Sequence, residues 1–284
     1  MSSAEPLLRM TQISKRFPGV VALNDVEFTL QKGEVHGLLG ENGAGKSTLI
    51  KVLTGVEHRD AGTVTLEGRQ IHPKSPLEAQ HEGISTVYQE VNLCPNLSVA
   101  ENIYIGRTPK TAFGINWREM NRKSAELLAK FNLSIDVTMP LDNYSVAIQQ
   151  MVAIARAVDI SAKVLILDEP TSSLTSVEVE KLFEIMRRLR ADGMGIVFVT
   201  HFLDQVYEVS DTITVLRNGE YVGTYEAAGL PRVQLVAKMI GKEYAELEGQ
   251  PPAAAAEVGG KEVFLHLEKA GTGDISNITL DINK

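Results

Sequence analysis

The chain has 284 residues and a formal net charge of −8, which argues against a sequence-independent grip on nucleic acid. Its single cysteine, Cys94, cannot form an internal disulfide, and residues 1–6 lack the basic and apolar regions of a signal peptide. No stretch approaches the ~18 uninterrupted apolar residues of a membrane span, so we expect a cytoplasmic chain that reaches any membrane through another protein.

Residues 40–47 read Gly-Glu-Asn-Gly-Ala-Gly-Lys-Ser, the full pattern of a phosphate-binding loop. The pattern lies between a predicted strand at 34–39 and a predicted helix that begins at Lys46. A phosphate-binding loop requires this position, because it connects a strand to the N-terminus of a helix. The glycines let backbone N–H groups turn toward phosphates, Lys46 adds a positive charge, and the Ser47 hydroxyl ligates Mg²⁺. We therefore predict a nucleoside triphosphate site made by Gly40, Asn42, Gly43, Ala44, Gly45, Lys46, Ser47 and Thr48.

Strand-like and helix-like segments alternate after this loop, which favours an α/β fold with a mostly parallel sheet covered by helices. Residues 84–88, 164–167 and 196–200 are predicted as short buried strands, because they are aliphatic or β-branched and bounded by polar residues. Between the first two strands lies a helical block, marked by residues 148–158 and by one apolar helical face: Met120, Leu127, Leu128 and Phe131.

Thr175 and Glu178 form a candidate capping box, with a threonine followed three residues later by a glutamate. The helix that would begin there directs one apolar face toward the core, made of Val179, Leu182, Phe183, Met186 and Leu189.

Two carboxylates, Asp168 and Glu169, follow the predicted strand at 164–167. The carboxyl ends of strands are where α/β folds bind their ligands. Asp168 would help to hold Mg²⁺, and Glu169 would take a proton from the water that attacks the γ-phosphate. The alternative is a plain acidic turn, which we disfavour because the phosphate loop requires a metal partner near a strand end.

The character of the chain changes after residue 245. Residues 247–260 contain prolines, alanines and glycines without a strand period, so we interpret 246–262 as a linker. Residues 278–284 repeat the alternation of residues 26–32, although alternation is common enough for a chance match. We expect a first domain in residues 1–245 and, in residues 263–284, the start of a second copy that is cut off.

Gln89 follows the strand at 84–88 and His201 follows the strand at 196–200. Either alone would be a solvated polar residue, as we expect of the other histidines, His36 among them. In chain order, the phosphate loop, Gln89, a helical block, Ser145, the carboxylate pair and His201 resemble the ATPase subunits of ATP-binding cassette (ABC) transporters over about residues 7–245. The resemblance implies MgATP as ligand and a P-loop cassette with an antiparallel β subdomain and an α-helical subdomain at about 95–160.

The same resemblance assigns roles. Gln89 would link Mg²⁺ and the attacking water to the transporter contact, and His201 would contact the γ-phosphate. Phe17 would stack on the adenine, with a buried strand-edge aromatic as the equal alternative. The first candidate for the family's Leu-Ser-Gly-Gly-Gln signature, residues 97–101, is explained by helix capping.

Residues 144–150 are the better candidate for the signature, which makes Ser145 the signature serine. Val146 and Ala147 stand where two glycines are usual, so side chains occupy the place where phosphate approaches. In the family, two cassettes pair and each signature faces the ATP site of the opposite cassette. We therefore expect that communication between the two ATP sites differs from the family norm.

Residues 40–48 and 200–207 look most like the bacterial monosaccharide importers, closest to the galactofuranose type. That likeness implies transport of galactofuranose or another pentose or hexose, at the cytoplasmic face of the inner membrane. The implied partners are a second nucleotide-binding domain of the same full-length chain, membrane permease subunits and, indirectly, a periplasmic sugar-binding protein. Because each site of the family is completed by the opposite cassette, we expect the present chain to bind MgATP and hydrolyse it poorly.

The alternative is a soluble tandem-cassette ATPase of the translation-factor kind. Those proteins resemble one another in a long, charged, helical connection between cassettes, which the Pro- and Ala-containing linker does not match.

Overall fold

The computed structural model describes residues 5–88, 93–160, 162–241, 263–272 and 275–283. These fall into two compact units, Met1–Gly241 and Lys242–Lys284. The first unit holds the predicted site, and each unit is described by itself.

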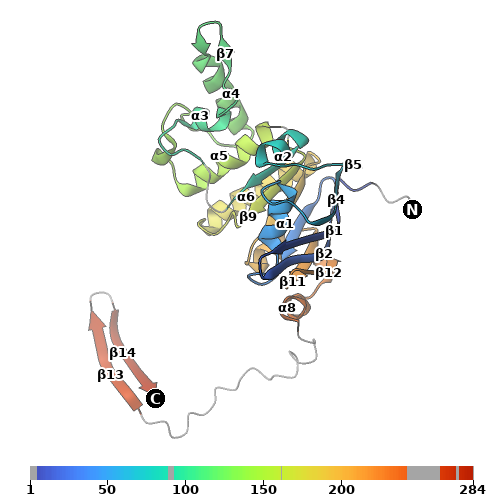
Figure 1. Ribbon diagram of the computed structural model, residues 1–284. Helices are drawn as coiled ribbons and strands as arrows, with labels where there is room; N and C mark the ends of the chain where they lie inside the picture. The colour runs from blue at the N-terminus through green and yellow to red at the C-terminus, as the bar shows by residue number, and fades with distance from the viewer. Residues whose placement is uncertain (1–4, 89–92, 161, 242–262, 273–274, 284) are drawn as a thin grey trace. The chain divides into compact units, whose positions relative to one another are not determined.

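A six-stranded sheet forms the centre of the first unit (Figure 1). Five of its strands run parallel, and only the edge strand β12 is antiparallel to its neighbour. The inner strands are buried along nearly their whole length, which explains their runs of Val, Ile and Leu. In spatial order the strands are β12 (Glu220–Glu226), β11 (Thr212–Arg217), β3 (Val35–Leu39), β10 (Gly195–Val199), β9 (Val164–Asp168) and β6 (Ile84–Val87).

Two hydrophobic cores cover the two faces of this sheet. Successive residues of β9 alternate between them, with Leu165 and Leu167 in one core and Val164 and Ile166 in the other. The first core includes apolar residues of α6 (Ser176–Ala191), α7 (Leu203–Val209) and α8 (Arg232–Ile240). The second includes residues of α1 (Lys46–Leu53) and α2 (Pro76–Glu82).

A four-stranded antiparallel sheet packs into the second core, as the resemblance implied. Its order is β2-β1-β4-β5, and its inward residues, such as Met10 and Phe28, are buried. The strands are β1 (Leu8–Phe17), β2 (Val20–Leu30), β4 (Ala61–Leu66) and β5 (Arg69–Gln70).

A helical layer projects from the rest of the first unit and ends in a small hairpin (Figure 1). Ser98 and Glu101 form the capping box of its first helix, so the rejection of residues 97–101 as a signature agrees with the structure. The layer contains α3 (Val99–Tyr104), β7 (Lys110–Thr111), β8 (Gly114–Ile115), α4 (Trp117–Ala129), the short 3₁₀ helix η1 (Leu141–Asn143) and α5 (Val146–Asp159). A second 3₁₀ helix, η2 (Ala227–Gly229), follows β12.

The predicted elements differ from the structure mainly at their ends. Phe131 is buried as expected but lies beyond α4, because Asn132 adopts a left-handed conformation that ends the helix. At the start of α6 the Glu178 carboxylate accepts hydrogen bonds from the Thr175 N–H and hydroxyl at 2.9 and 2.8 Å. The expected core face of α6 is buried, except that Val179 is only half-buried.

The described part of the second unit is one antiparallel hairpin, β13 (Val263–Thr272) and β14 (Ile275–Asn283). Its pairing resembles that of β1 and β2, because a register shift falls between the second and third of three corresponding pairs in each hairpin. Those pairs are Leu8–Leu30, Met10–Phe28 and Ile13–Val26 in one hairpin, and Leu265–Ile282, Leu267–Leu280 and Ala270–Ile278 in the other. The predicted linker at 246–262 lies outside the described residues.

Candidate nucleotide site

The phosphate-loop sequence joins the end of β3 to the start of α1, as predicted. Gly40 and Gly45 have φ angles of 153° and 104°, which favour glycine. A Cβ on Gly40 would overlap the carbonyl oxygen of Leu216, and one on Gly45 would lie 2.9 Å from that of Ala22. A Cβ on Gly43 would meet nothing within 4 Å, so this side of the loop is open to a ligand.

Lys46 points back across the loop at the first turn of α1. Its Nζ donates hydrogen bonds to the carbonyl oxygens of Gly40 and Glu41, at 2.7 and 3.0 Å. Burial lowers the pKa of Lys46 below its usual value, and the negative charges of Glu169 and Asp168 oppose part of that shift. The lysine and the two carboxylates, which are far apart in sequence, therefore share one electrostatic environment.

Asp168 ends β9, and its carboxyl group is half-buried. Burial and the neighbouring charge of Glu169 raise the pKa of Asp168 above its usual value, while Lys46 and Lys51 lower it. A divalent cation beside two crowded carboxylates would relieve their repulsion, so the donor chemistry fits Mg²⁺. No cluster of three or more His, Cys, Asp or Glu side chains occurs in the described ranges.

Glu169 and His201 are in direct contact. His201 Nδ1 lies 2.7 Å from Glu169 Oε2. Glu169 has a φ of 51°, and its N–H donates to the carbonyl oxygen of Val199 at 2.9 Å, which ties the β9 end to the neighbouring strand β10. The Glu169 side chain is 19% exposed and the His201 side chain is 62% exposed. Glu169 is therefore largely enclosed, whereas His201 is open to a ligand.

Phe17 lies at the end of β1, where it pairs with Val20 of β2. It is 36% exposed, so the structure does not support the alternative of a buried strand-edge aromatic. The start of β2 lies against the phosphate loop, because the Ala22 carbonyl packs beside Gly45. The place and exposure of Phe17 are compatible with a stacking role, which stays a prediction.

Ser145 is the N-cap of α5, and its hydroxyl accepts a hydrogen bond from the Ile148 N–H at 3.4 Å. Val146, where the family has glycine, is 49% exposed and stands beside that cap. Gln89 lies outside the described residues, so its predicted roles at the metal and the water stay predictions.

Comparison with known proteins adds independent support. The sequence profile of the ABC transporter family matches residues 23–172, more than half of the chain. The chain belongs to the ABC transporter family. This confirms the resemblance drawn from the motif order, and with it the P-loop cassette fold.

The relatives of this ABC cassette include ATP-binding proteins of sugar transporters. It is 59% identical over 239 residues to the galactofuranose transporter ATP-binding protein YtfR of Escherichia coli K12, which covers 84% of this chain and 48% of that protein. It is 48% identical over 288 residues to the fructose import ATP-binding protein FruK of Bifidobacterium longum, and this match covers 100% of this chain and 56% of that protein. The chain spans about half the length of these curated relatives. They lend no support to the translation-factor alternative.

Solved structures resemble the cassette as well. The ADP conformation of MJ1267, an ATP-binding cassette of an ABC transporter, has a TM-score of 0.73 and 27% sequence identity, and covers 87% of this chain and 100% of that one. A nucleotide-free ATP-binding cassette gives the same values. The fold expected from the sequence is thus confirmed, and the family is one that binds nucleotide.

The sequence did not predict one hydrogen bond that helps to position the site of the cassette. The buried Thr171 donates its hydroxyl proton to Gln205 Oε1 on α7 at 2.6 Å. This hydrogen bond joins the loop after Glu169 to the helix after His201. No motif signals it, because both residues are ordinary at their positions and only the fold brings them together.

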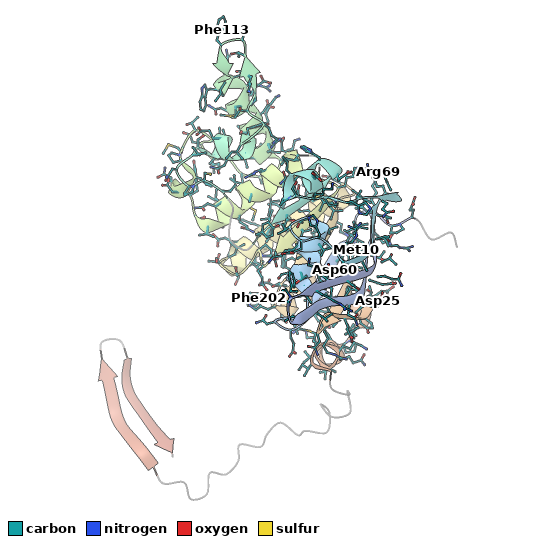
Figure 2. The ribbon with its side chains drawn as sticks, viewed as in Figure 1. Met10, Asp25, Asp60, Arg69, Phe113 and Phe202 are labelled. Carbon is teal, nitrogen blue, oxygen red and sulfur yellow. The ribbon has the colours of Figure 1, made fainter. Side chains whose placement is uncertain are left out.

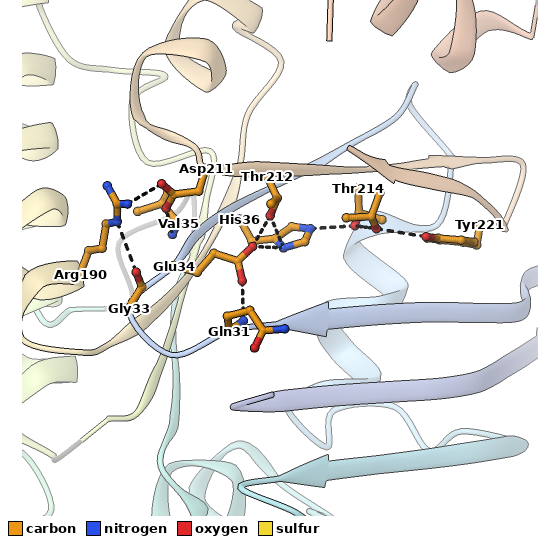
Figure 3. A network of polar contacts seen from close by, with 11 residues as sticks. Gln31, Gly33, Glu34, Val35, His36, Arg190, Asp211, Thr212, Thr214 and Tyr221 are labelled. Atoms are coloured by element: carbon orange, nitrogen blue, oxygen red, sulfur yellow. Dashed lines mark hydrogen bonds and ion pairs between the residues drawn. The ribbon is translucent and has the colours of Figure 1, made fainter. Parts of the chain in front are cut away.

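A buried polar network lies at the other end of β3 from the phosphate loop (Figure 3). His36 is 1% exposed, and its ring nitrogens lie 2.9 Å from Glu34 Oε1 and 2.7 Å from Thr214 Oγ1. Thr212 and the Gln31 N–H also donate to the Glu34 carboxylate. The expectation that His36 is a solvated histidine was therefore wrong.

Within the residues that the structure covers, no helix has both the length and the apolar content to span a bilayer.

Proposed function

We propose that the chain is the ATP-binding and ATP-hydrolysing part of an importer that carries a monosaccharide across a membrane. The observation that carries the proposal is the grouping of Lys46 with Asp168, Glu169 and His201 at the carboxyl ends of β3, β9 and β10. Lys46 suits phosphate binding, Asp168 suits metal binding, and Glu169 with His201 suits the activation of water. Nothing in a purely structural turn requires all of them together.

In this mechanism the loop N–H groups and Lys46 bind the β- and γ-phosphates. Mg²⁺, held by Ser47 and Asp168 with Gln89 as an additional ligand, would neutralise part of the phosphate charge. Glu169 takes a proton from the attacking water. His201 orients the Glu169 carboxylate through their 2.7 Å contact and faces the γ-phosphate with its exposed edge.

The sugar and the membrane partners come from the relatives. Galactofuranose, fructose and ribose or galactose appear in the names of similar import proteins, so we propose galactofuranose or another pentose or hexose as cargo. The chain would act at the cytoplasmic face of the inner membrane, bound to permease subunits that receive sugar from a periplasmic binding protein. We propose no role in nucleic-acid binding.

We further propose that residues 263–284 begin a second cassette, after a linker at 246–262. The pairing of β13 and β14 supports this, because it repeats the register shift of β1 and β2. The site around Lys46 would then be completed by the signature segment of the second cassette, and Ser145 would serve the second phosphate loop.

The decisive experiment compares the 284-residue chain with a longer chain that includes the second cassette. Both should bind MgATP in calorimetry, whereas steady-state hydrolysis should be much faster in the longer chain. Equal turnover of the two would contradict the shared-site arrangement, and absence of nucleotide binding in both would contradict the site itself.

The cargo needs its own test. The longer chain, reconstituted with its permease in vesicles, should hydrolyse ATP faster when a binding protein loaded with the correct sugar is added. A panel of galactofuranose, galactose, ribose and fructose identifies that sugar, and no stimulation by any sugar would contradict the importer assignment.

A further inference from the structure

The hairpin at the tip of the helical layer carries an unusual group of exposed apolar side chains. Phe113, in the turn between β7 and β8, is 102% exposed and lies at the outermost end of the layer (Figure 2). Ile115 follows in β8 and Trp117 begins α4, and they are 41% and 50% exposed. Ile105, just before the hairpin, is 39% exposed. Single exposed apolar residues are normal, but four within thirteen positions around one protruding turn are a local concentration.

Local contacts hold these residues in one structure. Lys110 pairs with Ile115 across the hairpin, and the Asn116 N–H donates to the carbonyl oxygen of Pro109 at 2.8 Å. The Phe113 N–H donates to the Thr111 hydroxyl at 3.2 Å, which shapes the turn. The exposure of Phe113 is therefore a property of a formed turn whose backbone is hydrogen-bonded.

The same segment is rich in cationic residues. Residues 105–123, which we call the tip segment, contain five of them and one carboxylate, although the whole chain has a net charge of −8. Glu119 and Glu126 neutralise two of the cations in i,i+4 pairs, and Asp159 pairs with a third. In the described part of the chain, no carboxylate forms an ion pair with Lys110 or Arg118. The cations of the tip segment are Arg107, Lys110, Arg118, Arg122 and Lys123.

This combination matches one kind of surface. Tryptophan and phenylalanine prefer the boundary between lipid headgroups and acyl chains, and nearby lysines and arginines are attracted to anionic headgroups. A fully exposed phenylalanine on a convex turn suits a soft interface into which it can insert. A protein partner would instead need a matching cavity.

We propose that the tip segment contacts an anionic membrane surface, with Phe113, Ile115 and Trp117 entering the headgroup region and Lys110 and Arg118 facing lipid phosphates. The contact goes beyond the proposed function and does not depend on nucleotide. It would make the cassette touch the bilayer directly, in addition to any contact with a permease.

Trp117 is the one tryptophan of the sequence, so its fluorescence reports on the tip segment alone. The 284-residue chain is mixed, without nucleotide, with vesicles of phosphatidylethanolamine and phosphatidylglycerol, and separately with phosphatidylcholine vesicles. We expect a blue shift of the Trp117 emission and co-sedimentation with the anionic vesicles only. Neither signal with anionic vesicles would overturn the proposal.

Variants test which residues are responsible. Phe113→Ser should weaken vesicle association about tenfold or more, and Lys110→Gln and Arg118→Gln about fivefold each. Matched controls on α6 are Val177→Ser, at an apolar side chain that is 68% exposed, and Lys181→Gln, and both should bind vesicles like the parent. Equal losses in the controls would overturn the proposal, because the association would then be unspecific.

The competing occupant is a protein. If the Trp117 emission shifts only when detergent-solubilised permease is added, and never with lipid vesicles, the tip segment binds the permease and the membrane proposal is wrong. Nucleotide binding depends on the phosphate loop and not on the tip segment. Calorimetric titration of Phe113→Ser with nucleotide therefore tests the proposed function separately from the membrane proposal.

Discussion

His201 Nδ1 lies 2.7 Å from Glu169 Oε2, and this contact joins the ends of two neighbouring parallel strands. The backbone reinforces it, since the Glu169 N–H donates to the carbonyl oxygen of Val199 at 2.9 Å. The carboxylate therefore has a fixed direction above the sheet edge. A group that accepts a proton from water works best when its position is fixed before the reaction.

The first prediction concerns the base. Glu169→Gln should lower the rate of ATP hydrolysis by about 10² to 10⁴, because the amide cannot accept the proton. Nucleotide affinity should change little, since the residue acts on water. Steady-state phosphate release by the longer chain that includes the second cassette, and calorimetry of MgATP, measure the two quantities.

Glu184, on the exposed side of α6, offers a matched control. Glu184→Gln should hydrolyse ATP like the parent. Unchanged turnover in Glu169→Gln would show that the base was wrongly assigned.

The second prediction follows from the contact itself. His201→Ala should slow hydrolysis and leave nucleotide affinity within about threefold, because the histidine positions a group that acts in the transition state. When two residues act as a unit, their effects do not add. The double variant of Glu169→Gln and His201→Ala should therefore be about as slow as the slower single variant, and multiplied losses would show that the two residues act independently.

The third prediction concerns the phosphate loop. Lys46→Ala should weaken nucleotide binding by about tenfold to a hundredfold, because a charge-assisted contact is worth roughly 1.5–3 kcal/mol. Calorimetric titration with MgATP and MgADP measures the loss. Lys181→Ala removes a lysine from α6 instead, and it should bind nucleotide like the parent. Equal affinity of Lys46→Ala and the parent would count against the loop assignment.

The sequence predicted most of the elements that form the site, for a physical reason. The phosphate loop combines a buried strand, obligatory glycines and a helix start, and these local requirements place β3 and α1 correctly. The strands β9 and β10 are short aliphatic runs buried on both faces, so their patterns were also clear.

The side-chain pairings were harder to predict. The contact of Glu169 with His201 depends on the neighbouring register of β9 and β10, in which Val199 pairs with Asp168. The burial of His36 depends on β11, which supplies Thr212 and Thr214 and was not among the predicted strands. A histidine in a polar sequence context looks solvated until the partners of its strand are known.

The last prediction uses that buried network. Burial alone raises the pKa of Glu34, but the hydrogen bonds and charge of His36, together with hydrogen bonds from Thr212 and the Gln31 N–H, bring it below its usual value of 4.5. A carboxyl group with a lowered pKa in the folded state adds stability above its unfolded pKa and loses that contribution as the pH falls through the folded value. Glu34→Gln keeps the shape of the side chain but removes the charge, so it should cost about 1–3 kcal/mol at neutral pH.

The pH dependence distinguishes this cause from a packing defect. The difference in urea unfolding free energy between the parent and Glu34→Gln should shrink as the pH falls below about 4.5, because the parent then becomes protonated at Glu34 as well. Glu184→Gln, exposed on α6, should show no such difference at any pH. A loss in Glu34→Gln that stays the same down to low pH would mean that the amide disturbs packing around Phe28, whose ring lies 4.7 Å from that of His36, and that the charge of Glu34 adds nothing.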